Sequence, residues 1–187
     1  MVRSVALIGP QGAGKTTLAE MLVEFRGYQR HGIADAIKEV TRLAYPTVTK
    51  QECFTVSRYY GPQEVSGREL FQEVGAALRS VDNDFWLRVW GRDYFELIRM
   101  GYPVVIDDVR LPREAEYLKT VSPDILLVRI HASPEARAER VGPLLGIHDI
   151  TEQGWLATPF DIQIDTSELT SERAFWSLVD QIDEESL

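Results

Sequence analysis

The chain has 187 residues, of which 44% are apolar and 26% charged, so we expect one soluble domain (1–187) large enough to bury a core. Its net charge of −9 argues against sequence-independent nucleic-acid binding, which needs cations that neutralise phosphates. A single cysteine excludes an internal disulfide and fits a reducing cytosol. We recognise neither a signal peptide nor an apolar run of membrane-spanning length. We therefore expect a cytoplasmic protein with no membrane or nucleic-acid partner.

Short apolar runs alternate with helix-like patterns along the chain. We expect strands at 4–8, 28–33, 103–107, 125–130 and 161–165. We expect helices at 16–25, 35–45, 66–81, 84–100, from Pro112 onward, from Pro134 onward, and at 171–182. Residues 46–65 and 142–159 look like loops. Such alternation predicts an α/β fold with a parallel, doubly wound sheet and helices on both faces. Trp and Leu residues of the 84–100 helix would serve either a dimer or the core.

A phosphate loop follows the first predicted strand. Gly9, Gly14, Lys15 and Thr16 match every fixed position of the G-x-x-x-x-G-K-[ST] pattern. Its small residues let successive backbone N–H groups wrap a polyphosphate, and the following helix points its positive end at the same charge. Lys15 would reach the β- and γ-phosphates, and the Thr16 hydroxyl would ligate Mg²⁺. We expect ATP to be bound by Gln11, Gly12, Ala13, Gly14, Lys15, Thr16 and Thr17, together with Arg137.

Another candidate site lies where the 103–107 strand ends in Asp107 and Asp108. Nucleotide enzymes place a Mg²⁺-supporting carboxylate at such a position. Either aspartate could hold the metal or its waters, and we choose Thr16 and Asp108 as the metal residues. Arg110 is placed to meet a phosphate.

Further cations come from Arg137 and Arg140, which share one face of the helix that begins near Pro134. Phosphoryl transfer needs cations around the transferred group, and a closing lid can supply them. We therefore expect residues 137–159 to form a lid. Catalysis would rest on Lys15, Asp108, Arg110, Arg137 and Arg140.

The mostly helical segment 34–101 is the natural place for a second substrate. It carries several cations and aromatic side chains that could bind a phosphate and stack on a base: Lys38, Arg42, Arg58, Arg68 and Arg79, with Tyr59, Tyr60, Phe71 and Trp86.

Several segments resemble motifs of the bacteriophage deoxynucleoside monophosphate kinases. They are 34–38, 67–75 (followed by Arg79, Asp82 and Trp86), 105–115 and 148–152, where Thr151 replaces a serine. The resemblance covers most of the chain. Near the last strand, Asp165-Thr166-Ser167 stands where this family often has an asparagine turn beside the adenine.

The resemblance implies a three-layer P-loop kinase fold with a five-stranded parallel sheet in the order 2-3-1-4-5, a helical acceptor-binding insertion and a short lid. It implies transfer of the γ-phosphoryl group of ATP, with Mg²⁺, to a nucleoside 5′-monophosphate such as dTMP or dGMP. The implied acceptor-binding residues are Asp35, Lys38, Arg68, Phe71, Gln72, Arg79, Trp86, Asp108 and Arg110.

Arg68 and Arg79 lie three helical turns apart, roughly 16 Å along the axis, so they cannot grip one phosphate together. We expect Arg79 to make the contact.

Animal phosphomevalonate kinases share a similar layout, so a kinase of another small metabolite is the main alternative. A switch GTPase would need an Asn-Lys-x-Asp base reader, but the only asparagine, Asn83, precedes Asp84. The acidic charge and small size argue against a motor ATPase that handles DNA.

Overall fold

The computed structural model describes residues 2–142 and 154–185. The chain forms two compact units, a larger one of Met1–Gly32 and Gly91–Leu187 and a smaller one of Ile33–Trp90. Of the predicted lid, residues 143–153 lie outside the described part of the chain, and so does the 148–152 segment. No helix among the described residues is both long and apolar enough to cross a membrane.

The larger unit is built on a parallel sheet of five strands in the order β2-β5-β1-β6-β7. The strands are β1 (Val5–Ile8), β2 (Gln29–Arg30), β5 (Val104–Val109), β6 (Leu126–His131) and β7 (Ile162–Asp165). Numbered among themselves, these strands follow the order 2-3-1-4-5, which confirms the predicted topology. The labels β3 and β4 belong to a hairpin in the smaller unit.

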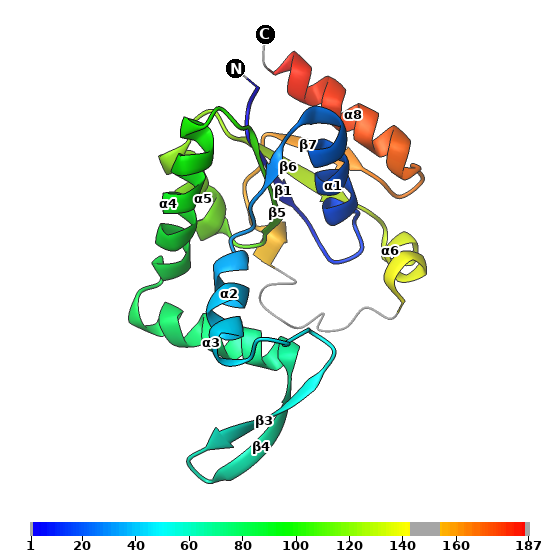
Figure 1. The fold of residues 1–187 in the computed structure, drawn as a ribbon. Helices are drawn as coiled ribbons and strands as arrows, with labels where there is room; N and C mark the ends of the chain where they lie inside the picture. Colours follow the sequence, from blue (N-terminus) through cyan, green and yellow to red (C-terminus); the bar gives the residue numbers. More distant parts are fainter. Residues whose placement is uncertain (1, 143–153, 186–187) are drawn as a thin grey trace. The chain divides into compact units, whose positions relative to one another are not determined.

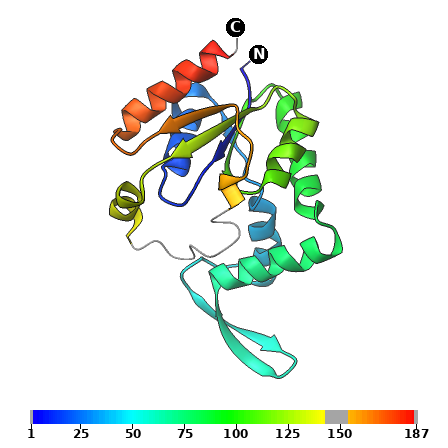
Figure 2. The ribbon, with the colours of Figure 1, turned by 180° about the vertical axis from the view of Figure 1, so that it is seen from behind.

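Helices cover both faces of this sheet (Figure 1). Their bounds in the larger unit are α1 (Lys15–Arg26), the later part of α4 (Phe85–Arg99), α5 (Pro112–Val121), α6 (Pro134–Val141) and α8 (Ser171–Glu184). α1 and α8 lie side by side in both views, and their Phe25 and Phe175 ring centroids are 5.7 Å apart (Figure 2). α4 and α5 pair through a 2.8 Å hydrogen bond from the Tyr94 hydroxyl to Ser122. The three-layer prediction is therefore confirmed.

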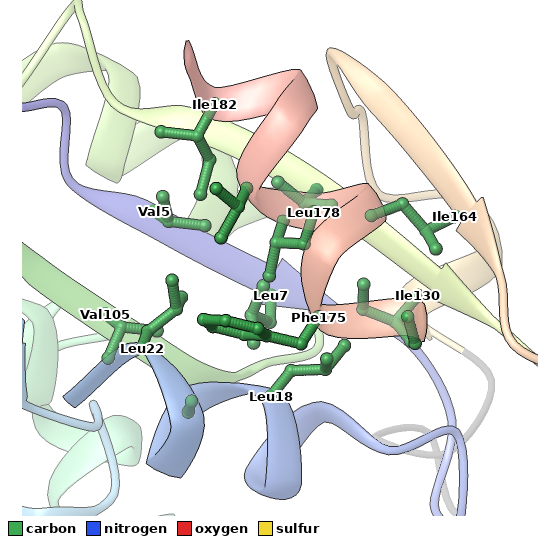
Figure 3. Close-up of a cluster of buried hydrophobic side chains, with 14 of the residues drawn as sticks. Val5, Leu7, Leu18, Leu22, Val105, Ile130, Ile164, Phe175, Leu178 and Ile182 are labelled. Atoms are coloured by element: carbon green, nitrogen blue, oxygen red, sulfur yellow. The ribbon is translucent and has the colours of Figure 1, made fainter. Parts of the chain in front are cut away.

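The main core lies between the sheet and the α1–α8 pair. Apolar side chains of β1 and β5 meet Leu18, Leu22, Phe175 and Leu178 from the helices (Figure 3). These four side chains are at most 2% exposed. Burying side chains of this size contributes roughly 1.5–3 kcal/mol each. This core fixes the strands whose carboxyl ends carry the candidate site.

Several helix boundaries follow from the capping residues expected in the sequence. Ser66 and Glu69 form the reciprocal capping box at the start of α3. Pro112 stands at the first turn of α5, and Ser133 accepts a hydrogen bond from the backbone of Ala136 at the start of α6. Gly27 ends α1 with a positive φ of 71°. These local signals placed the helix ends to within a residue or two.

The smaller unit is mainly helical. It contains α2 (Asp35–Ala44), α3 (Gly67–Val81) and the first part of α4, together with the antiparallel strands β3 (Cys53–Arg58) and β4 (Gly61–Ser66). The prediction of a loop over 46–65 was therefore wrong for the hairpin. Tyr59 and Tyr60, at its tip, are 94% and 97% exposed. Trp86, Leu87 and Trp90 on α4 are at most 4% exposed, so these side chains are buried within the chain.

Candidate active site

The phosphate loop joins β1 to α1, as predicted. Its last glycine, Gly14, caps α1 with a φ of 97°, a conformation that side chains rarely adopt. A Cβ on Gly9 would lie 2.2 Å from the carbonyl oxygen of Ile130 on β6, so the loop can pass this strand only without a side chain there. The loop leads into the first turn of α1, and the N-terminus of a helix favours an anion.

Lys15 is folded back onto this loop. Its ammonium group donates hydrogen bonds to the carbonyl oxygens of Gly9 at 2.6 Å and Pro10 at 2.8 Å, and the residue is 8% exposed. These carbonyls hold a buried cation next to the N-terminus of α1. The cation and the helix end together make a positively charged site suited to phosphate.

Thr16 joins the phosphate loop to β5. Its hydroxyl donates a 2.8 Å hydrogen bond to Oδ2 of Asp107. The same carboxylate receives two further hydrogen bonds from Arg30, at 2.9 Å from Nε and 2.8 Å from Nη2. The Asp107 side chain is 4% exposed, whereas that of Arg30 is 40% exposed. A buried carboxylate therefore lies between the phosphate loop and the end of β2.

The choice between the two aspartates depends on an irregularity in β5. Ala6 pairs with Ile106 but Ile8 pairs with Val109, so one residue of β1 faces both Asp107 and Asp108. Such a bulge re-aims side chains at a strand end. Asp107 is the aspartate hydrogen-bonded to Thr16, whereas the Asp108 charge raises the pKa of Glu114. The structure thus brings Asp107 to the loop, and the assignment of the metal to Asp108 stays a prediction.

Arg137 and Arg140 lie on α6 beside the phosphate loop. Arg137 donates to the carbonyl oxygen of Gln11 at 3.4 Å, and Arg140 donates to that of Gly12 at 3.3 Å. A Cβ on Gly12 would lie 3.1 Å from the Cβ of Arg137, so this glycine lets the helix approach. The structure thus places both predicted lid cations at the loop that would carry the phosphates.

The turn after β7 closes the other side of the loop. The Thr166 side chain lies within hydrogen-bonding distance of the Ala13 carbonyl at 3.0 Å and of Arg140 at 3.1 Å. Ser167 accepts a 2.9 Å hydrogen bond from the backbone of Ser133 at the start of α6. The Asp165–Ser167 turn therefore sits against both the phosphate loop and α6.

Arg110 follows β5 and is held from two directions. Its backbone N–H donates a 2.7 Å hydrogen bond to Glu114, which also accepts from Leu111 at 3.0 Å. Burial raises the pKa of Glu114 to about 7, although these two hydrogen bonds oppose the shift. On the other side, Thr158 donates to the Arg110 carbonyl at 3.4 Å. The backbone that presents Arg110 is thus fixed.

The smaller unit gathers some of its predicted acceptor residues around Gly75. A Cβ on Gly75 would lie 3.0 Å from Nη2 of Arg79 and 3.2 Å from Cδ1 of Ile37, so the missing side chain lets the guanidinium lie against α3 next to α2. Trp86, which is 2% exposed, donates a 3.0 Å hydrogen bond to the Gly75 carbonyl. On α2, which carries Ile37, Asp35 and Lys38 form a 2.6 Å ion pair.

The other acceptor candidates of the smaller unit, Arg68, Phe71 and Gln72, lie in the first half of α3. Arg68 and Gln72 are exposed, and the backbone of Arg68 donates to the Lys50 carbonyl at 3.3 Å. Phe71 packs on a small cluster formed by Val48, Val65 and Leu70. The structure thus separates Arg68 from the Gly75 group that contains Arg79.

Sequence reasoning missed two groups of this site, Arg30 and Thr166. Arg30 ends a two-residue strand, and its partner Asp107 is 77 positions away. In the sequence, Arg30 is marked only as a cation within the predicted 28–33 strand. Thr166 was noted only as a departure from the family pattern.

No family model matches the chain. A protein of Acanthamoeba polyphaga mimivirus named "Putative deoxynucleotide monophosphate kinase" is 28% identical over 134 residues, which cover 62% of this chain and 67% of that protein.

Solved structures resemble this chain over nearly its whole length. A gluconokinase from Sinorhizobium meliloti has a TM-score of 0.57 at 15% identity, with coverage of 98% of this chain and 93% of that one. A shikimate kinase from Acinetobacter baumannii in complex with shikimate has a TM-score of 0.54 at 14% identity, with coverage of 100% and 96%. An APS kinase from Mycobacterium tuberculosis in complex with AMPPNP and APS has a TM-score of 0.52 at 10% identity, with coverage of 97% of each chain. The chain therefore has the fold of the P-loop kinases.

Proposed function

We propose that this protein is an ATP-dependent kinase whose acceptor is a nucleoside 5′-monophosphate. The observation that carries the proposal is the phosphate loop in its complete setting: Lys15 at its centre, Thr16 bound to Asp107, and Arg137 and Arg140 on its rim. Phosphoryl transfer depends chiefly on positioning and on fixed positive charge, and this loop supplies both.

The donor nucleotide would lie on the phosphate loop. Its β- and γ-phosphates would take the loop N–H groups and the Lys15 ammonium, which would leave the Gly9 and Pro10 carbonyls. Arg137 and Arg140 would balance charge on the transferred group. The 165–167 turn beside α6 is the proposed border of the adenine site.

The residues around Thr16 fit a magnesium ion. A threonine hydroxyl and a carboxylate 2.8 Å apart provide the hard oxygen donors that Mg²⁺ prefers. No cluster of three or more His, Cys, Asp or Glu residues suited to a metal occurs within 2–142 and 154–185. Mg²⁺ sites of nucleotide enzymes complete their shell with phosphate oxygens and water, so these two residues suffice. Bound there, the ion would neutralise charge on the β- and γ-phosphates.

The acceptor is proposed to bind the smaller unit through Arg79. Its guanidinium lies over Gly75 and next to Ile37, in the region that resembles the acceptor-binding motif. Arginine binds phosphate bidentately and keeps its charge, which suits an acceptor that brings nearly two negative charges toward a triphosphate. The name of the mimivirus relative supports the same acceptor class. Preference for dTMP or dGMP is part of this proposal.

Phosphorylation of another small metabolite is the second candidate. Trp86, one of the aromatic side chains expected to face a base, is 2% exposed and hydrogen-bonded within the unit. Its burial removes one stacking surface and favours a smaller, non-aromatic acceptor to that extent.

An acceptor screen separates these candidates. The purified protein would be given ATP and Mg²⁺ with each of the nucleoside and deoxynucleoside monophosphates, gluconate, shikimate or phosphomevalonate, and ADP release would be measured. We expect ADP release to depend on a nucleoside monophosphate. ADP release that is the same with and without each acceptor contradicts the kinase proposal. ADP release that depends on a non-nucleotide acceptor supports the second candidate.

A further inference from the structure

Arg30 forms an ion pair with the carboxylate proposed to support magnesium. In the parallel pairing of β2 with β5, Arg30 lies opposite Val105, two positions before Asp107. Side chains two residues apart in a strand share a face, so this register carries the Arg30 side chain toward Asp107. The resulting bidentate pair, at 2.9 and 2.8 Å, joins the end of β2 to the end of β5.

The Arg30–Asp107 pair compensates a buried negative charge when no nucleotide is bound. The Asp107 side chain is 4% exposed, and a carboxylate buried to this extent costs several kcal/mol if nothing compensates its charge. Lys15 is directed to the Gly9 and Pro10 carbonyls, and Thr16 donates a neutral hydrogen bond. Arg30 places a full positive charge in direct contact with Asp107.

We propose that Arg30 is a charge placeholder for the divalent ion at Asp107. This inference rests on the proposed function, because it takes Asp107 and Thr16 to be the metal-supporting pair. With nucleotide absent, the guanidinium compensates the carboxylate; with metal and nucleotide present, the same positive charge competes with the ion for Asp107. Arg30 therefore stabilises the empty site and weakens binding of the metal.

The proposal predicts the direction in which metal affinity changes when the Arg30 charge is removed. Arg30 and a divalent ion that serve one carboxylate repel each other, and the 40% exposure of the Arg30 side chain lets solvent reduce this repulsion without removing it. Loss of the charge should therefore tighten metal binding. If Arg30 only oriented Asp107, its loss would instead weaken metal binding.

Two substitutions separate charge from geometry. Arg30→Gln removes the charge, whereas Arg30→Lys keeps it and loses the bidentate fork. Arg26→Gln is the matched control, because Arg26 on α1 also pairs bidentately, with Asp183 of α8 at 3.3 and 2.7 Å, but the Asp183 side chain is 56% exposed whereas that of Asp107 is 4% exposed. Each variant is made in the full chain.

The first measurement is thermal unfolding in EDTA without nucleotide. We expect Arg30→Gln to lower Tm by at least about 4 °C, because it leaves a buried charge uncompensated. We expect a smaller loss in Arg30→Lys and little change in Arg26→Gln. If the Tm of Arg30→Gln equals that of Arg26→Gln, the role of Arg30 in the empty site is overturned.

The second measurement is the Mg²⁺ dependence of binding of a non-hydrolysable ATP analogue, followed by calorimetry. We expect the half-saturating Mg²⁺ concentration to fall by about threefold or more in Arg30→Gln and to stay near wild type in Arg30→Lys and Arg26→Gln. An unchanged or higher value in Arg30→Gln overturns the placeholder role alone. Failure of the wild-type protein to bind the analogue at any Mg²⁺ concentration overturns the proposed function and the placeholder role with it.

Discussion

The carboxylate of Glu114 accepts a 2.7 Å hydrogen bond from the backbone N–H of Arg110. Burial is the largest influence on this carboxyl group and raises its pKa to about 7, and the nearby Asp108 charge acts in the same direction. Glu114 thus anchors the backbone of Arg110 and Leu111 just after β5, while its own ionisation is unfavourable.

This pKa shift predicts a pH dependence of stability. Between the unfolded pKa, near 4.5, and the folded pKa, about 7, the folded protein binds more protons at Glu114 than the unfolded chain. The contribution of this group to the free energy of unfolding therefore falls as pH rises through that window. Glu114→Gln removes the effect, so the stability of the variant relative to wild type should rise by on the order of 1–3 kcal/mol from pH 5 to pH 8.

Urea unfolding at several pH values measures this difference, with Glu116→Gln on the exposed face of α5 as the control. A relative stability of Glu114→Gln that stays flat or falls over pH 5–8 would show that the Glu114 carboxyl group titrates normally.

Asp107 and Asp108 should differ in their effect on the metal requirement. Because the Thr16 hydroxyl contacts Asp107, we expect Asp107→Asn to raise the Mg²⁺ concentration for half-maximal activity by about tenfold or more. Asp108→Asn should change it little. Steady-state assays at saturating ATP with varied Mg²⁺ measure both, and the opposite pattern would move the metal role to Asp108.

Substitutions of Arg79 and Arg68 should have different effects on activity, because these residues lie at opposite ends of α3. Arg79→Ala should raise the KM for the deoxynucleoside monophosphate, or lower kcat, by tenfold or more with little change in the KM for ATP. Arg68→Ala is the matched control and should have a smaller effect. If the KM for ATP changes and that for the acceptor does not, the smaller unit is not the acceptor site.

Arg129 should stabilise the larger unit. Its guanidinium donates to the carbonyls of Trp155, Leu156 and Thr158 at 2.9–3.3 Å and lies 3.9 Å above the ring of Phe160. We expect Arg129→Ala to cost about 1–3 kcal/mol of unfolding free energy. Arg99→Ala, which removes an exposed pair with Glu96, should cost little. Equal losses in the two variants, measured by urea unfolding, would contradict a fixing role for Arg129.

Local sequence patterns were enough to predict most of the fold. The apolar runs at 4–8 and 125–130 and the phosphate-loop pattern identify β1, β6 and the start of α1, because each depends on neighbouring residues alone. The same patterns could not predict the β3–β4 hairpin. In β3, half-buried Phe54 and Val56 alternate with exposed residues, but over six residues only, and β4 begins with Gly61 and Pro62, which are typical of a turn.

The site was harder to predict, because its key contacts join distant residues. The side of β5 that faces Thr16 depends on a shift of pairing between Ala6 and Ile8, which no count along the sequence reveals. For the same reason the sequence left Asp107 and Asp108 as alternatives. Arg30 meets Asp107 only through the register of two strands that are 77 positions apart at this contact.

The central claim, transfer of the γ-phosphoryl group of ATP to a nucleoside monophosphate, is tested most directly by following the label of [γ-³²P]ATP in the presence of Mg²⁺ and each monophosphate. We predict labelled deoxynucleoside diphosphate with the wild-type protein. We predict formation lowered by on the order of 10²–10⁴ in a folded Lys15→Ala variant, because that ammonium would stabilise charge developing between the β- and γ-phosphates. Exposed Lys50→Ala should match wild type. Label found only in inorganic phosphate, or undiminished transfer by Lys15→Ala, would contradict the claim.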